Sequence, residues 1–199
     1  MGKEKHLKKV EELFKKSPVV SYSSIQRIIR DKKETKYAKL LVSNLVRKGK
    51  IKKLTKGFYT AHDNVQLSIF CFKPAYFGLQ DALSFHNMWE QETIPVILTT
   101  RKVRRGIREI LGTNVLIRKI EKKYFFGFDY VQQGDFYIPY SDIEKTLIDM
   151  IYFHEKIDEE AIKNIAKSID KKKLDSYLRK YPLSIRKKVL NKIYKKKPI

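Results

Sequence analysis

The chain has 199 residues, 42% of them hydrophobic, and a formal net charge of +22. This composition supplies enough apolar surface for folded cores and excludes a largely disordered chain. No apolar run is long enough to cross a bilayer, and the first residues lack the apolar core of a signal peptide, so we expect a cytoplasmic protein with no membrane partner. The only cysteine, Cys71, excludes an internal disulfide.

The positive charge is concentrated at the two ends of the chain. Residues 1–64 carry a net charge of +12, residues 65–159 carry −1, and residues 160–199 carry +11. Basic ends around a neutral middle are expected if both ends face a polyanion, because lysines near phosphates release condensed counterions. The alternative is that the lysines serve solubility, which explains the lysine content but not the neutral middle.

The first 64 residues predict three helices followed by a tight hairpin. Apolar stripes mark one helix over residues 7–14 and a second that begins near residues 21–24. Thr35 is a suitable N-cap for the third helix, and Gly49 is suited to its left-handed C-terminal cap. The sequence IKKLTKGFYT that follows predicts two short strands joined by a glycine turn.

This order of elements is typical of a winged helix-turn-helix, in which the third helix enters the major groove of DNA. The predicted DNA-binding residues lie in the turn before this helix, on its outward face and on the hairpin, or wing: Lys32, Lys33, Lys36, Lys39, Ser43, Arg47, Lys52, Lys53 and Lys56. The alternative is a helix and hairpin of another small domain with solvated lysines.

Residues 65–199 predict a second, mixed α/β domain with a helical C-terminal tail, so the chain as a whole is α+β. We expect strands at 65–72, 93–100 and 113–120, a helix at 76–88, and an aromatic hairpin at 124–140. The aromatic side chains of this hairpin either pack in the interior, which we favour, or form an exposed apolar patch. A further helix is expected to open with a capping box from Ser141 to Glu144. Three more helices are expected over residues 158–194.

The chain resembles the AbiEi-type antitoxins and transcriptional regulators. The resemblance is carried by GKIKKLTKGFY, AYFGLQDALSFHNMWEQ with IPVILTT, RKVRRG, PYSDIEKTLIDMIYF and KKLDSYLRKY, which together cover most of the chain. It implies a repressor of its own operon that binds double-stranded DNA and, in complete systems, neutralises a nucleotidyltransferase-type toxin. It places the DNA contacts on the third helix and wing already named, and leaves open whether the protein acts as a monomer or a dimer.

The second domain carries a basic segment formed by Arg101, Lys102, Arg104 and Arg105. These side chains could form a second phosphate site or a surface for an acidic toxin. A solvated loop is the alternative, because runs of charge usually face water.

The sequence predicts no enzyme, no metal site and no cofactor. Its four histidines share no ligand spacing, and no glycine-rich phosphate loop is present. Asp129 and Asp135 in the aromatic hairpin could hold a metal, but turn aspartates usually face solvent. A competing prediction is a basic winged helix that binds structured RNA, on whose bases Tyr22, Tyr37 and Tyr59 would stack.

Overall fold

The computed structural model describes residues 2–29 and 35–194 and has the mixed α+β character that the sequence predicts. The chain divides into two compact units, residues 1–71 with 109–113 and residues 72–108 with 114–199. Lys32 and Lys33 lie outside the described residues, and the side chain of Lys36 lies outside the described part of α3. Within the described ranges, no helix combines the length and apolar composition needed to cross a membrane.

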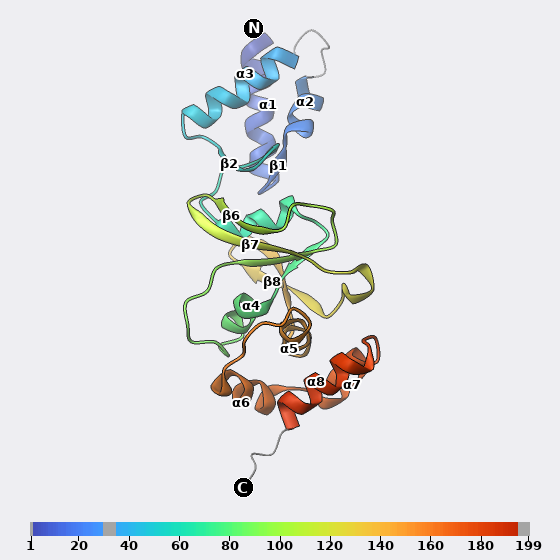
Figure 1. Ribbon diagram of the computed structural model, residues 1–199. Coiled ribbons are helices and arrows are strands. Elements are labelled where there is room, and N and C mark those ends of the chain that lie inside the picture. Colours follow the sequence, from blue (N-terminus) through green and yellow to red (C-terminus); the bar gives the residue numbers. More distant parts are fainter. Residues whose placement is uncertain (1, 30–34, 195–199) are drawn as a thin grey trace. The chain divides into compact units, whose positions relative to one another are not determined.

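The first unit contains the predicted three helices and hairpin (Figure 1). Its elements are α1 (Gly2–Lys16), β1 (Val20–Ser21), α2 (Tyr22–Ile29), α3 (Thr35–Arg47), β2 (Lys52–Thr55) and β3 (Phe58–Thr60). The apolar stripes of the three helices meet in one core, where Val10, Ile25 and Leu45 are almost fully buried. Burial of these stripes stabilises the unit, because removing apolar surface from water is the main favourable term in folding.

Strand β1 was not predicted from the sequence. It has only two residues, which is too short for any alternation of apolar and polar side chains to be visible. Val20 and Ser21 pair antiparallel with Tyr59 and Phe58, so the sheet has the order β1-β3-β2. The Oγ of Ser21 also accepts a 3.1 Å hydrogen bond from the backbone amide of Ser24, which caps α2.

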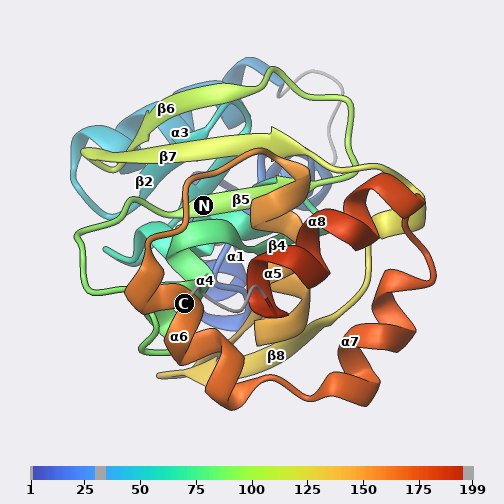
Figure 2. The same ribbon diagram turned by 60° about the horizontal axis from the view of Figure 1, so that its bottom comes forward.

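The second unit is a six-stranded sheet with helices on one face. Its elements are β4 (Ala75–Phe77), α4 (Leu79–Phe85), β5 (Val96–Thr99), β6 (Gly106–Ile110), β7 (Thr113–Lys119), β8 (Phe128–Gln133), β9 (Phe136–Ser141), α5 (Ile143–Tyr152), α6 (Glu159–Ser168), α7 (Lys171–Leu178) and α8 (Leu183–Tyr194). The strand order is β6-β7-β5-β4-β9-β8. Figures 1 and 2 show α4 to α8 on the same face of this sheet.

Two predicted elements are wrong. Residues 65–71 form a 3-10 helix rather than a strand, and they bury the adjacent residues Leu67, Ser68 and Ile69 instead of alternate ones. The expected helix over 76–88 is a strand, β4, followed by the shorter helix α4. Gly78 lies between the two elements. Glycine fits this position because a Cβ there would come within 2.7 Å of the side chain of Leu98. Short apolar runs fit either kind of element, so tertiary packing decided both cases.

The helix after the aromatic hairpin is present, but its predicted cap is wrong. Ser141 ends β9, and Asp142 is the N-cap of α5, accepting a 2.7 Å hydrogen bond from the amide of Lys145. Glu144 does not reach back to its own helix. It accepts a 2.7 Å hydrogen bond from the amide of Asp170 and so joins α5 to the start of α7. Asp and Ser are equally good caps, so the sequence alone could not choose between them.

Candidate nucleic-acid interface

Helix α3 presents one apolar face to the core and one polar face to solvent. Ala38, Leu41, Val42 and Leu45 are buried in the first unit. Lys39, Ser43 and Arg47 are exposed, as their spacing of three and four residues predicts. The structure therefore brings these three candidate contacts together on one side of α3.

The outward face of α3 also carries residues that the sequence analysis did not select. Leu40, which follows Lys39 in the sequence, is 57% exposed. Asn44 accepts a 3.0 Å hydrogen bond from Arg47 Nη2, which orients the guanidinium along the helix. Leu40 follows the same three- and four-residue spacing as the predicted contacts, so the sequence contained a pattern that could have identified it. An apolar side chain in that pattern is usually assigned to a core, which is why it was not predicted.

The C-terminal end of α3 is held by a Schellman motif. The amide of Lys50 donates to the carbonyl oxygen of Leu45, and the amide of Gly49 donates to that of Val46, both at 3.0 Å. Gly49 has φ of +69°, so the predicted left-handed cap is confirmed. This turn fixes the point at which the chain leaves α3 and enters β2.

The hairpin that follows is closed by a two-residue turn, Lys56-Gly57. Thr55 pairs with Phe58 across the turn, and Gly57 has φ of +79°, a conformation that glycine adopts without strain. The carbonyl oxygen of Gly57 accepts a 2.8 Å hydrogen bond from the amide of Tyr22 at the start of α2. The tip of the hairpin is thus tied to the helical part of the unit.

The hairpin lysines differ in their surroundings. Lys52 is half-buried and forms an ion pair with Asp63. Lys53 and Lys56 are exposed, and within the described part of the chain neither forms an ion pair. Two of the three predicted wing contacts therefore offer a charge that no neighbouring carboxylate offsets.

The predicted basic segment of the second unit lies between β5 and β6, where Arg101, Lys102, Arg104 and Arg105 are all exposed. The segment is anchored from β6, because Arg108 Nη2 donates a 2.5 Å hydrogen bond to the carbonyl oxygen of Arg104. The guanidinium of Arg108 also lies over the Phe72 ring, 5.7 Å from its centroid. A phosphate site or a partner surface at this segment stays a prediction.

The second unit contains a buried ionic cluster that joins α5 to the sheet. Lys145 and Asp149 are both fully buried and form an ion pair one helical turn apart. Tyr76 on β4 donates a 2.7 Å hydrogen bond to Asp149 and accepts one of 2.9 Å from Lys145. Burial lowers the pKa of Lys145 and raises the pKa of Asp149, because desolvation penalises each charge, while the ion pair opposes both shifts.

This cluster has no access to solvent, so its arrangement suits a structural role. The Lys145 ammonium lies over the rings of Tyr76 and Phe126, at 5.3 and 5.4 Å from their centroids. Gly127 packs so closely that a Cβ there would come within 2.9 Å of the side chain of Lys145. A substrate could not reach these groups without opening the core. Asp149, which is fully buried, is therefore an internal anchor.

A chain of polar contacts continues from the cap of α5 to α7. Tyr177 donates a 2.9 Å hydrogen bond to Asp142, and Lys173 forms ion pairs with Asp142 at 3.1 Å and Glu144 at 3.4 Å. Burial, together with the bond to Asp142, raises the pKa of Tyr177 to about 12. These contacts position α7 against the N-terminal end of α5.

The described residues contain no group of three or more His, Cys, Asp or Glu side chains that could hold a metal ion. Asp129 and Asp135, the two hairpin aspartates considered as a metal pair, are both exposed. Gly134 and Asp135 form the turn between β8 and β9, since Gln133 pairs with Phe136.

Comparison with known proteins gives a likeness in fold. The sequence matches no protein-family model and no curated protein. Among solved structures, the crystal structure of the RV2827C protein from Mycobacterium tuberculosis is similar, with a TM-score of 0.60. The likeness covers 94% of this chain and 74% of that chain at 10% sequence identity, so it bears on the fold alone.

Proposed function

We propose that this protein is a DNA-binding transcriptional regulator whose first unit is a winged helix-turn-helix. The observation that carries the proposal is the element order α1-β1-α2-α3-β2-β3 with the sheet order β1-β3-β2, combined with a cationic outward face on α3. In this arrangement α3 is the recognition helix and the β2–β3 hairpin is the wing. A recognition helix of this kind enters the major groove.

The residues on α3 suit both parts of DNA recognition. Lys39 and Arg47 can neutralise phosphates or donate to guanine edges, and the hydroxyl of Ser43 can bond to either. The exposed side chain of Leu40 adds an apolar group that can contact the methyl group of thymine in the major groove. A helix face that combines polar donors with an exposed apolar side chain can therefore distinguish bases as well as bind phosphates.

The wing supplies sequence-independent affinity. Lys53 and Lys56 are exposed on a hairpin whose tip is tied to α2 through the bond from Tyr22 to Gly57. A hairpin held in this way does not have to be ordered when it binds, so less conformational entropy is lost. Phosphate contacts at the wing would fix the orientation of α3 in the groove.

The second unit is proposed to hold a partner, as the resemblance to AbiEi-type antitoxins implies. In that case the protein represses its own operon and neutralises a nucleotidyltransferase-like toxin in the cytoplasm. The exposed basic segment Arg101–Arg105 supports a surface for an acidic partner, because its four cations are displayed together.

The RNA alternative is less well supported by the geometry. Stacking on bases requires exposed aromatic faces, whereas Tyr22, Tyr37 and Tyr59 are each half-buried. Burial also raises the pKa of Tyr59, which is consistent with a ring partly enclosed by the unit.

A competition experiment tests the proposal. The protein binds a labelled duplex from upstream of its gene at about 0.15 M salt. Three unlabelled competitors are then added in separate titrations: the same upstream duplex, an unrelated duplex and a structured RNA. We expect the upstream duplex to compete at least about 10³-fold better than either of the others. Equal competition by structured RNA would contradict a DNA regulator.

A pair of charge-matched variants locates the binding surface. Lys39→Gln with Arg47→Gln removes two charges from α3, and Lys122→Gln with Lys156→Gln removes two exposed charges from the neutral middle of the chain. We expect the first pair to weaken binding of the upstream duplex by about 100-fold, since each contact to a charged group contributes about 1.5 kcal/mol. The second pair is expected to bind as the unaltered protein does.

A further inference from the structure

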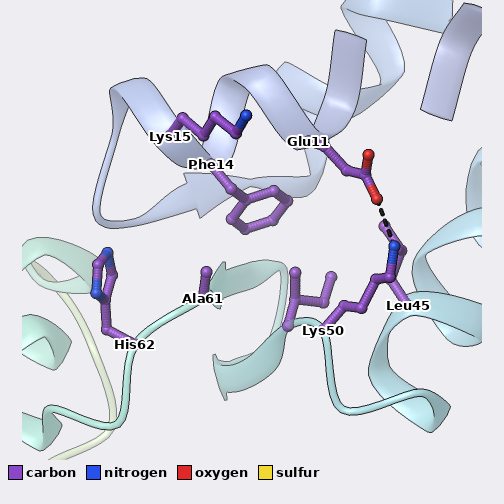
Figure 3. A pocket seen from close by; sticks show the side chains of 8 residues that line it. Glu11, Phe14, Lys15, Leu45, Lys50, Ala61 and His62 are labelled. Atoms are coloured by element: carbon purple, nitrogen blue, oxygen red, sulfur yellow. Dashed lines mark hydrogen bonds and ion pairs between the residues drawn. The ribbon is translucent and has the colours of Figure 1, made fainter. Parts of the chain in front are cut away.

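The first unit contains a pocket of about 420 Å³ on the side of α3 that faces its core. Its apolar lining comes from three segments: Phe14 on α1, Leu45 and Ile51 at the junction of α3 and β2, and Ala61 just after β3. Figure 3 shows the Phe14 ring lying between α1 and the backbone at Ala61. The volume falls within the range typical of small-molecule sites, about 300 to 1,000 Å³.

Four polar side chains line the pocket. Figure 3 shows His62 at one end, Glu11 with Lys50 at the other, and Lys15 on α1 between them. The Glu11 carboxylate is already occupied, because it accepts a 2.7 Å hydrogen bond from Lys50 Nζ. Lys15 is exposed and has no ion pair among the described residues, so the charge left for a ligand is positive.

We propose that this pocket binds a small aromatic carboxylate. The flat ring would lie over the exposed Ala61 and contact the small part of Phe14 and Leu45 that is not buried, 6% and 3% of each residue. The carboxylate would accept a charge-assisted hydrogen bond from Lys15. A neutral molecule of the same shape would leave that ammonium without a partner.

The pocket has a direct connection to the recognition helix. Leu45 and Lys50, which line it, are the acceptor and donor of the hydrogen bond that ends α3, and Ile51 leads into β2. A ligand in contact with this turn stabilises the angle between α3 and the wing at which its own contacts are most favourable. Control of DNA affinity by the ligand rests on the proposed function, whereas binding of the ligand does not.

Binding is tested on the full chain with 2-naphthoate and, as the neutral control, 2-naphthamide, without DNA. Amide chemical shifts are followed by NMR as each compound is added. We expect 2-naphthoate to shift the amides of Phe14, Leu45 and Ala61 and to bind about tenfold more tightly than 2-naphthamide, which is the contribution of one charge-assisted bond. Equal affinity for the two compounds, or shifts confined to other residues, would overturn the proposal.

Two variants locate the site without disturbing the core. Lys15→Gln should lower the affinity for 2-naphthoate about tenfold and leave that for 2-naphthamide unchanged, while the neighbouring exposed Lys16→Gln should change neither. Ala61→Phe should fill the pocket and abolish binding of both. If Ala61→Phe does not fold, the Lys15→Gln comparison still decides, and an unchanged affinity there would refute the charge assignment.

A separate measurement addresses regulation. The affinity of the protein for its upstream duplex is measured with and without saturating 2-naphthoate, and again for Lys15→Gln. A change of several-fold that is lost in Lys15→Gln would support coupling through the end of α3. If the duplex does not bind at all, the proposed DNA function fails, but the NMR result for the ligand site stands independently.

Discussion

The backbone amide of Lys50 donates a 3.0 Å hydrogen bond to the carbonyl oxygen of Leu45, and this bond ends α3 immediately before β2 begins. Gly49 lies between the two residues and makes the bond possible by adopting φ of +69°. The direction in which the hairpin leaves the helix is therefore set by one glycine. Substitutions at this position should affect the helix and the hairpin together.

Gly49→Ala is expected to destabilise the first unit by about 1 kcal/mol, because a Cβ disfavours the left-handed conformation. No atom lies within 4 Å of the added Cβ, so the effect comes from the backbone and not from a clash. Thermal unfolding followed by circular dichroism measures it. Gly49→Asn is the control, since Asn tolerates this conformation better. Equal destabilisation by Ala and Asn would contradict the explanation.

The wing lysines should affect the salt dependence of DNA binding unequally. Replacing Lys53 and Lys56 by Gln is expected to lower the slope of log K against log salt by about 2, because each phosphate contact contributes about 0.9. Lys52→Gln should change it much less, since Lys52 is already paired with Asp63. Titrations at several salt concentrations give the slopes. An equal loss from Lys52→Gln would show that its ion pair with Asp63 opens on binding.

The buried pair in the second unit makes a strong prediction for stability. Asp149→Asn should destabilise the protein by about 3 kcal/mol, because Lys145 is left buried without its counter-charge. The triple variant Lys145→Met, Asp149→Leu and Tyr76→Phe should recover most of this loss, because it leaves no polar group of the cluster buried without a partner. Urea unfolding of the single and triple variants measures both. A triple variant that is less stable than Asp149→Asn would mean that the cluster contributes through packing and not through charge.

Asp81 should make stability depend on pH. Burial raises its pKa to about 7, and the 3.1 Å hydrogen bond from the amide of Val96 only partly offsets this effect. The unfolded chain loses the proton near pH 4, so stability falls as pH rises from about 4 to about 7 and stays lower above that range. Asp81→Asn cannot ionise and should gain up to about 4 kcal/mol at pH 8, since each step of one in pKa is worth about 1.4 kcal/mol, and little at pH 4.

Unfolding midpoints at pH 4, 6 and 8 check this prediction. The exposed Asp129→Asn is the control and should shift all three midpoints equally. A gain for Asp81→Asn that is the same at pH 4 and pH 8 would show that its carboxyl is not desolvated in the folded protein.

Much of the first unit could be predicted because its signals are local. The apolar stripes, Gly49 and the Lys56-Gly57 turn each report on a few neighbouring residues, and the structure confirms the corresponding elements. Strand β1 could not be predicted, since its two residues gain their strand character only by pairing with β3. Among the described residues, Lys52 is paired and Lys53 is not, because Asp63 lies beside Lys52. No local sequence pattern identifies this partner.

The second unit was predicted less well because its long-range contacts decide local structure. Tyr76 lies in a strand because β4 pairs with both β5 and β9, although the surrounding residues also fit a helix. The cluster of Lys145, Asp149 and Tyr76 was missed for the same reason. Lys145 and Asp149 have the spacing of an ordinary surface ion pair on a helix, and only the packing of α5 on the sheet buries them.

We expect the outward face of α3 and the β2–β3 hairpin to contact the same DNA duplex. The most direct measurement places the photo-crosslinking residue p-benzoylphenylalanine at Leu40 on α3 or at Lys56 on the wing, with Ser176 on α7 as the control. We predict that both Leu40 and Lys56 variants crosslink to the upstream duplex, at positions within about one helical turn of each other, and that the Ser176 variant does not. Crosslinking from Ser176 but from neither Leu40 nor Lys56 would contradict DNA binding by α3 and the wing.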